Sequence, residues 1–113
     1  MVRYLMFDDD VLRAKVEIEA IGADEGERVR ATLVALAQRL ADFGTLRGGK
    51  FHRLESPFEQ LYEFKPGNYR AIAYRKGNVY VIVRVVRKAS KKAQNNDYRS
   101  ADKIRNHYYN GKP

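Results

Sequence analysis

The second half of the chain gathers cationic and phenolic side chains on or just after segments rich in β-forming residues. These are Arg70, Arg75, Arg84, Arg87, Lys88, Lys91, Lys92 and Tyr98. Such a set suits a phosphodiester. RNA cleavage by attack of the 2′-hydroxyl places additional negative charge on the phosphate oxygens in the transition state, and preorganised Arg and Lys groups stabilise that charge. A general base and a general acid are also required.

The net charge is concentrated in the same half. The 113 residues hold 22 Lys and Arg against 14 Asp and Glu, for a net charge of +8. Residues 1–46 carry six basic and nine acidic side chains, a net charge of −3, whereas the remainder carries 16 and five, a net charge of +11. One-sided basic charge indicates a polyanionic partner. A solvated surface is the alternative interpretation.

Composition argues against several other chemistries. The chain has no Cys, which removes disulfides, thiolate zinc sites and Cys nucleophiles, and it has two His, too few to favour a structural metal site. Gly48-Gly49-Lys50 lacks the spacing of a phosphate-binding loop. No apolar run approaches the roughly 18 residues of a membrane span. The first ten residues, MVRYLMFDDD, end in three aspartates, at positions where a signal peptide requires an apolar stretch. We therefore expect a soluble, cytoplasmic protein that uses no cofactor or metal.

One α+β domain must position the candidate residues, because this length allows a single core. Residues 2–7 predict a short strand, and residues 11–21 fit either a short helix or, from Lys15, an alternating strand. Asp24 and Glu27 resemble a capping box. They precede an amphipathic helix that ends at Gly44 and whose apolar positions are Val29, Leu33, Leu36, Leu40 and Phe43.

The remaining chain predicts an antiparallel meander and a final helix. Residues 60–65, 69–75 and 79–86 are β-rich and are separated by turn sequences that contain Gly67 and Gly77. In the last strand we expect Val79, Val81, Val83 and Val85 on one face and Tyr80, Ile82, Arg84 and Val86 on the other. Residues 51–54 fit a further extended segment, and residues 88–96 an exposed basic loop. A short helix with apolar positions Tyr98, Ala101, Ile104 and Tyr108 follows. We expect the helices on one face of the sheet and the other face open.

Four ordered segments resemble the RelE/HigB superfamily of toxin endoribonucleases, in particular its phage-derived HigB branch. They are Leu61-Tyr62-Glu63-Phe64-Lys65, residues 69–74, residues 79–86 and Arg87-Lys88, within a likeness that spans about residues 50–108. The resemblance implies helices packed on a twisted antiparallel sheet with a late helix. It also implies a ribosome-dependent messenger RNA endonuclease that cuts by 2′-hydroxyl attack. The implied partners are the ribosome, its messenger RNA and a cognate antitoxin of helix-turn-helix type.

The resemblance also implies roles for individual residues. Arg70 matches the position that contacts the scissile phosphate, with a cross-strand ion pair to Glu63 as the alternative. Arg87 and Lys88 match transition-state cations, with a solvated strand end as the alternative. Tyr98 matches a tyrosine that orients or deprotonates the attacking hydroxyl, and a core tyrosine is the competing interpretation.

Glu63 is either a general base or an electrostatic tether for Arg70, and we favour the tether. Cations at Lys65, Arg75, Lys91 and Lys92 are predicted to bind RNA. We interpret His52 as a surface or half-buried histidine, with a role as base as the alternative. The chain departs from the family pattern at Lys65, where Arg is usual, and at Ala89 and Ala93, which replace Thr and Pro.

A second function class fits the same residues. A non-catalytic RNA-binding or ribosome-binding module would use the same basic surface, with Tyr69, Tyr74 and Tyr80 as stacking platforms. A DNA-binding accessory protein is a third possibility. An enzyme should lose far more rate than affinity when Arg70 or Arg87 is removed, whereas a binding module should tolerate the loss of any one cation.

Overall fold

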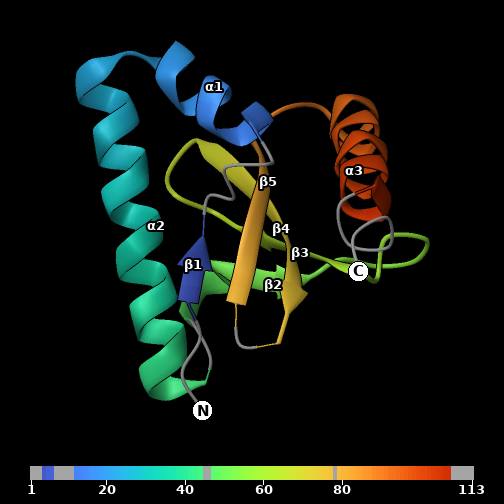
Figure 1. Cartoon of the computed structure of the whole chain (residues 1–113), viewed down its shortest axis with the longest axis horizontal. Helices are drawn as coiled ribbons and strands as arrows, with labels where there is room; N and C mark the ends of the chain where they lie inside the picture. The colour runs from blue at the N-terminus through green and yellow to red at the C-terminus, as the bar shows by residue number, and fades with distance from the viewer. Residues whose placement is uncertain (1–3, 7–11, 45–46, 78, 108–113) are drawn as a thin grey trace.

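A computed structural model describes residues 4–6, 12–44, 47–77 and 79–107. The elements follow one another as strand, two helices, four strands and a final helix, which confirms the α+β class (Figure 1). Their bounds are β1 Tyr4–Met6, α1 Leu12–Ile21, α2 Ala23–Phe43, a 3-10 turn Arg47–Gly49, β2 Phe51–Arg53, β3 Leu61–Phe64, β4 Tyr69–Lys76, β5 Val79–Arg87 and α3 Lys91–Arg105.

The five strands form one sheet in the order β1-β5-β4-β3-β2. Strands β2 to β5 are antiparallel, as the meander predicts, and β1 joins the edge by pairing in parallel with β5. The turn between β3 and β4 places Gly67 at φ 63, a left-handed conformation that glycine adopts without strain. Parts of the predicted first strand and of the second turn lie outside the described residues.

Helix α2 follows the predicted pattern closely. Its apolar positions Val29, Leu33, Leu36 and Leu40 are buried, and Gly44 ends it in the left-handed conformation with its N–H donating to the carbonyl of Leu40. Two details of the prediction are wrong. The capping position is Gly22 and no side chain caps the helix, so Asp24 and Glu27 form no capping box; Phe43 is 75% exposed. The segment before α2, for which both helix and strand fitted, is the helix α1.

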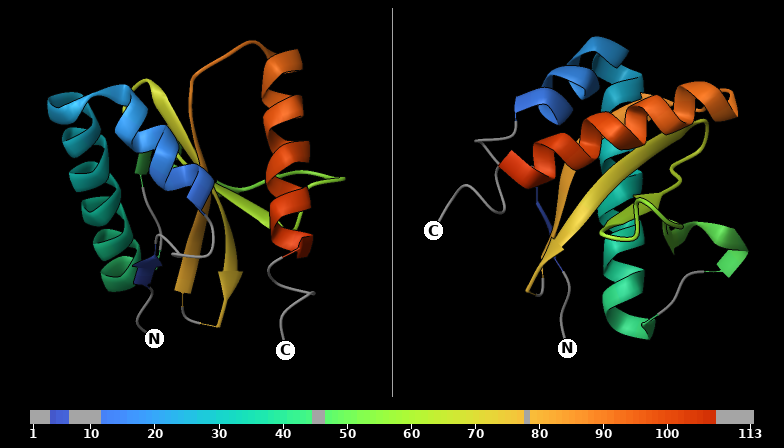
Figure 2. Two further views of the ribbon diagram at one scale, coloured as in Figure 1. Left: turned by 45° about the horizontal axis from the view of Figure 1, so that its top comes forward. Right: turned by 90° about the vertical axis from the view of Figure 1, so that its right-hand side faces the viewer.

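Helices cover both faces of the sheet, so the expectation of one open face is wrong (Figure 2). Helices α1 and α2 pack on one face, here called the helix-pair face. Helix α3 packs on the opposite face, here called the α3 face, over Leu54, Leu61, Ile72, Tyr74, Val81 and Val83. The cause is the composition of β4 and β5, which are apolar at successive positions and must be covered on both sides.

A β-bulge in β5 changes which side chains face α3. Ile72 lies opposite Arg84 and Ala73 lies opposite Ile82, so one additional residue, Val83, is inserted between them. Beyond the bulge the alternation reverses: Val86 packs on the α3 face with Val81, and Val85 packs on the helix-pair face with Ile82. The predicted alternation is therefore wrong from Arg84 onward.

Helix α3 begins earlier than predicted. Ser90 caps it by accepting a hydrogen bond from the backbone N–H of Ala93, so the polar segment expected to be a loop is helical from Lys91. Tyr98, Ala101 and Ile104 pack on the α3 face as predicted, and Tyr108 lies outside the described residues. Within the described ranges, no helix is long and apolar enough to cross a membrane.

Candidate functional site

Glu63 is the buried centre of a small polar cluster on the α3 face. Glu63 is 1% exposed, and its Oε2 accepts a 2.7 Å hydrogen bond from the hydroxyl of Tyr98. On the other side of the carboxylate, Oε1 lies 3.8 Å from Nε2 of His52, which is the cross-strand partner of Glu63 on β2. The cluster therefore joins β2, β3 and α3 through three side chains.

Tyr98 is held in its neutral form. Burial raises the pKa of its hydroxyl well above the usual value, and the hydrogen bond to Glu63 and the charge of that carboxylate raise it further; the charge of Arg70 acts in the opposite direction. At neutral pH Tyr98 therefore stays protonated, and its hydroxyl is the hydrogen-bond donor to Glu63. This arrangement suits a group that orients the carboxylate rather than one that removes a proton from substrate.

Arg70 lies near the cluster without pairing with Glu63. Its Nη1 donates to the carbonyls of Gly67 (3.0 Å) and Tyr69 (2.8 Å). The predicted ion pair with Glu63 is wrong, since no such contact exists in the described part of the chain. Arg70 is 9% exposed, and no buried side-chain nitrogen of the described residues lacks a partner. Nε and Nη2 of Arg70 have no partner among the described residues, so neither nitrogen is completely buried.

Arg87 lies on the other side of the sheet from Arg70. It is the cross-strand partner of Tyr69, to whose hydroxyl its Nη2 donates at 3.0 Å, and its guanidinium lies 5.2 Å from the centroid of the Tyr69 ring. Partner residues share a face of the sheet, and Tyr69 belongs to the helix-pair face. The structure therefore does not bring Arg70 and Arg87 to one site. Lys88 follows β5 with an exposed side chain, and its backbone N–H donates to Asn68.

The four predicted RNA-binding cations are also spread over the surface. Lys91 and Lys92 are exposed in the first turn of α3. Lys65 is half-buried directly after β3. Arg75 is exposed, its Nε donates to Gly77, and it lines a groove of about 360 Å³ together with Arg53 and Arg105.

A larger groove of about 690 Å³ runs between α3 and residues 52–58, directly beside the Glu63 cluster. It combines three kinds of side chain that suit a nucleotide: cations, aromatic or imidazole rings, and amides. The cations are Arg53, Lys91 and Arg99, the rings are His52, Phe58 and Tyr98, and the amides are Gln94 and Asn95. Among the described residues that line it, Glu55 is the only acidic one. We call this the α3 groove.

From the sequence we assigned no binding role to Arg53 or Arg99, and we interpreted His52 as a surface or half-buried histidine with a role as base as the alternative. The available signal was the spacing of Lys91, Asn95, Tyr98 and Arg99, which places them on one face of a helix that begins at Lys91. Because residues 88–96 were predicted to be a loop, the helical spacing of these side chains was not considered.

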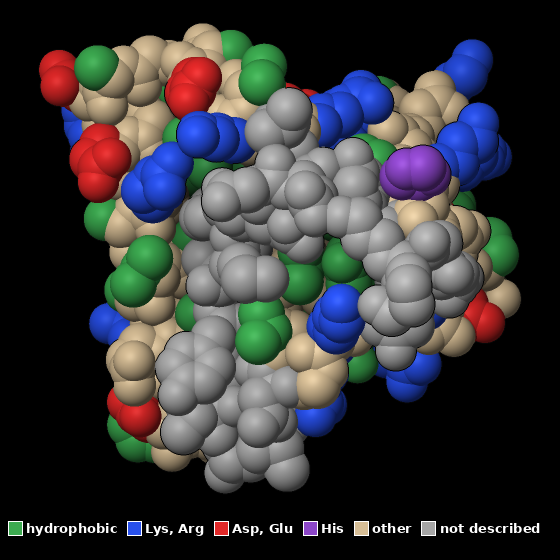
Figure 3. All heavy atoms as spheres, in the orientation of Figure 1, with side chains coloured by type: hydrophobic (Ala, Val, Ile, Leu, Met, Phe, Trp, Pro, Cys, Tyr) green, Lys and Arg blue, Asp and Glu red, His purple; other side chains and the backbone are tan. Residues whose placement is uncertain are grey.

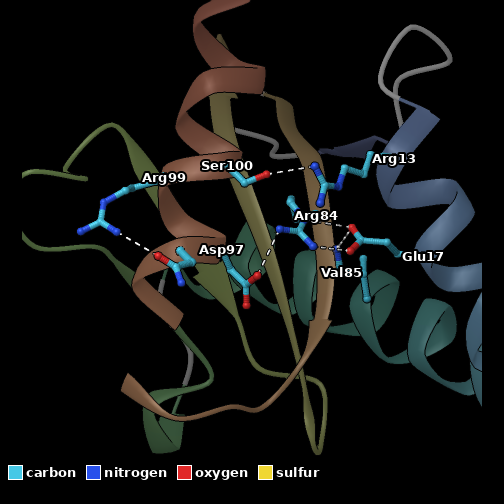
Figure 4. Close-up of polar contacts among 8 residues, drawn as sticks. Arg13, Glu17, Arg84, Val85, Asp97, Arg99 and Ser100 are labelled. Atoms are coloured by element: carbon cyan, nitrogen blue, oxygen red, sulfur yellow. Dashed lines mark hydrogen bonds and ion pairs between the residues drawn. The ribbon is translucent and has the colours of Figure 1, made fainter. Parts of the chain in front are cut away.

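Arg84, a candidate cation in the sequence, has a structural role (Figure 4). Its Nη2 and Nε bind the carboxylate of Glu17 in α1, and its Nη1 donates to Asp97 in α3 at 3.1 Å. Glu17 also accepts a hydrogen bond from the backbone N–H of Val85, next to the bulge. Burial lowers the pKa of Arg84, but its hydrogen bonds and the charges of Glu17 and Asp97 outweigh burial and raise it overall.

The charge difference between the two halves of the sequence is visible on the surface. Figure 3 shows mainly Lys and Arg side chains around the side of the molecule where α3 lies, whereas over α1 and α2 acidic side chains are mixed with Lys and Arg. No group of three or more possible metal ligands occurs among the described side chains. The arrangement favours an anionic ligand at the α3 side.

The fold defines the molecule as an α+β protein whose five-stranded sheet is covered on both faces. No family model matches the chain, and no curated protein matches it in sequence. Among solved structures, the chain is similar to the toxin–antitoxin complex RelBE2 from Mycobacterium tuberculosis, with a TM-score of 0.46 and 14% identity, over 77% of this chain and 99% of that chain.

Proposed function

We propose that this protein is a ribosome-dependent messenger RNA endonuclease and the toxin of a toxin–antitoxin pair. The α3 groove is the observation that carries the proposal, because it places three cations and three rings beside a buried carboxylate. That carboxylate accepts a hydrogen bond from Tyr98 and lies 3.8 Å from His52. The resemblance of residues 61–88 to the RelE/HigB superfamily supports the same function independently of the groove.

The proposed reaction is an internal transfer at phosphorus. The 2′-oxygen attacks the adjacent phosphorus, the bond from phosphorus to O5′ breaks, and the products are a 2′,3′-cyclic phosphate and a 5′-hydroxyl. Lys91 and Arg99 hold phosphates that flank the reacting one. Nε and Nη2 of Arg70, which have no partner among the described residues, stabilise the charge that develops on the phosphate oxygens.

Dependence on the ribosome is what the resemblance to the RelE/HigB superfamily implies, and the small number of cations beside the cluster is compatible with it. Arg87 lies on the opposite face, so the site has fewer charges for the transition state than the sequence predicted. A site of this kind gains most when another assembly holds the RNA in line for attack, since positioning alone supplies a large part of a rate enhancement. The proposed antitoxin would block or distort the same basic side of the molecule.

The test compares variants of two arginines, Arg70 and Arg87. The sequence predicts that both act on the phosphate, whereas the structure places them on opposite faces of the sheet. Wild type, Arg70→Ala and Arg87→Ala are expressed under tight induction, and growth is followed together with primer extension on an abundant message, with and without translation. We expect wild type to arrest growth and to cut translated messages only. Arg70→Ala should lose cleavage while remaining folded, and Arg87→Ala should keep most of it.

A non-catalytic RNA-binding module is the second candidate. It is favoured by one observation: Arg70 is largely buried and two backbone carbonyls already occupy its Nη1. In that case wild type should bind single-stranded RNA, leave translated messages intact and cause no arrest. Loss of Arg70 should then weaken binding only slightly.

A further inference from the structure

His52 connects the buried cluster to the α3 groove. Its side chain is 41% exposed and lines the groove, while its Nε2 is turned toward Oε1 of Glu63 at 3.8 Å. The imidazole is thus in contact with two environments: a carboxylate that is almost fully buried, and a cavity of a size and composition that suit a nucleotide. No other histidine lines the groove.

Glu63 selects which nitrogen of His52 faces a ligand. A carboxylate beside one ring nitrogen favours the N–H on that nitrogen and leaves the lone pair on the other. With Nε2 directed at Glu63, the lone pair is on Nδ1, the ring nitrogen that does not face the carboxylate. The separation of 3.8 Å exceeds a hydrogen bond, and contacts of this type commonly shorten when substrate binds.

Tyr98 fixes the carboxylate in that orientation. Its hydroxyl occupies Oε2 of Glu63 at 2.7 Å, so Oε1 is the oxygen left for His52. Since Tyr98 is the donor in this bond and stays protonated, it is poorly placed to accept a proton from substrate. Glu63 is 1% exposed and cannot reach substrate directly.

The other charged groups around His52 suit binding better than proton transfer. They come from its own strand and the loop that follows, from β3, and from α3: Arg53, Glu55, Glu63, Lys91 and Arg99. The cations among them suit the binding of phosphates. Imidazole is the side chain that can both accept and donate a proton near neutrality.

We propose that His52 is the general base of this site, accepting the 2′-hydroxyl proton of RNA bound in the α3 groove, and that Glu63 is the residue that positions it. The inference rests on the proposed function. The proton moves from the 2′-oxygen to Nδ1 of His52 as that oxygen bonds to phosphorus. O5′ leaves with the electron pair of the broken bond and takes a proton from water.

The experiment uses the full chain and purified ribosomes programmed with a defined message. Wild type, His52→Gln and His52→Asn are compared in single-turnover cleavage across pH 5.5 to 8.5, and the matched control is His107→Gln, which changes the second histidine of the chain. Affinity is measured separately, by anisotropy with a 2′-O-methyl RNA that cannot be cleaved. Urea unfolding establishes that each variant is folded.

We expect both His52 variants to cleave about 10²- to 10⁴-fold more slowly than wild type, the usual range for loss of a general base, with affinity changed by less than about threefold. Their residual rate should not rise with pH as the wild-type rate does. A third variant, His52→Ala, is assayed with and without added imidazole, which should partly restore its cleavage. His107→Gln should behave as wild type. Glu63→Gln should slow cleavage by about 10- to 100-fold, as the loss of an orienting partner does at comparable histidine sites.

Two results would overturn the inference, and they are distinguishable. If wild type cleaves and both His52 variants cleave at its rate with the same pH profile, the proposed function stands and His52 is not the base. If wild type leaves ribosome-bound message intact under every condition, the proposed function and the role of His52 are both rejected.

Discussion

The hydroxyl of Tyr98 donates a 2.7 Å hydrogen bond to Oε2 of Glu63, across 35 positions of sequence. This bond joins α3 to an inner strand of the sheet and supplies a donor to a carboxylate that is almost completely buried. A buried charge must be neutralised or hydrogen-bonded. The bond therefore serves both the attachment of α3 and the geometry of the candidate site.

Removing this hydroxyl should destabilise the protein. Tyr98→Phe leaves Oε2 of Glu63 without its donor while retaining the ring that packs on the α3 face. We expect the free energy of unfolding to fall by about 1–3 kcal/mol, the cost of an unsatisfied buried acceptor. Urea unfolding at pH 7 measures it. Tyr62→Phe, in the same strand as Glu63, is the matched control and should change stability by less than about 0.5 kcal/mol.

Tyr98 should also make stability fall at alkaline pH. Its folded-state pKa is raised above the value of about 10 that it has in an unfolded chain. Below the unfolded-state pKa, Tyr98 is protonated in both the folded and the unfolded protein, and its full contribution to the free energy of unfolding is present. As pH rises further, the unfolded state loses its proton first, so unfolding becomes more favourable. Between pH 9 and 11, the urea midpoint of wild type should therefore fall more steeply than that of Tyr98→Phe. Parallel slopes would contradict this assignment.

Local patterns predicted part of the fold. The spacing of Val29, Leu33, Leu36 and Leu40 and the stop at Gly44 defined α2, because amphipathic periodicity and a left-handed glycine act within one helix. The meander followed from turn sequences between β-rich runs, which also act over a few residues. These features depend little on the rest of the molecule.

What the sequence did not predict depends on contacts between distant segments. The inserted Val83 reverses the alternation of β5, and a bulge leaves no pattern in a run of valines. The first turns of α3 contain few apolar residues, so periodicity does not indicate where the helix begins. It begins after Ser90, whose side chain caps it. The β2 pairing that places His52 opposite Glu63 is equally non-local, so the sequence predicted a surface or half-buried His52, with a role as base as the alternative, and did not predict its contact with Glu63.

Arg84 should contribute more to the stability of the fold than to RNA binding. Arg84→Met removes the guanidinium that binds Glu17 and Asp97, whose side chains keep 19% and 22% exposure. Because breaking a buried pair leaves uncompensated charge, and because these carboxylates retain some solvent, we expect a loss of about 2–4 kcal/mol. Urea unfolding measures it, with the exposed Arg28→Met in α2 as the control. A loss equal to that of the control would show that the network contributes no stability.

Gly26 should resist replacement by alanine despite its position inside a helix. In an open helix this change stabilises by about 1 kcal/mol. Here a Cβ on Gly26 would lie 2.7 Å from the backbone carbonyl oxygen of Ile18, so α1 would have to move away from α2. We expect Gly26→Ala to lower the free energy of unfolding by about 1–3 kcal/mol, as overpacking does. A rise in the urea midpoint would mean that the two helices separate easily.

The salt dependence of RNA binding tests whether the α3 groove is where the phosphates lie. Lys91 lines the groove, whereas Lys103 is exposed on the same helix and does not. Each lost contact to single-stranded RNA lowers the slope of log K against log salt by about 0.7, so Lys91→Ala should show this decrease and Lys103→Ala should not. The probe is a 2′-O-methyl RNA in anisotropy titrations.

The same pair of variants separates binding from folding. Lys91 stands in the first turn of α3, where a positive charge opposes the helix dipole. Its removal should therefore leave stability unchanged or raise it by a few tenths of a kcal/mol, about the lower end of such dipole effects. Weaker binding by Lys91→Ala, without any loss of stability, assigns the lysine to the ligand. Equal slopes for the two variants would place the phosphates on another part of the basic surface.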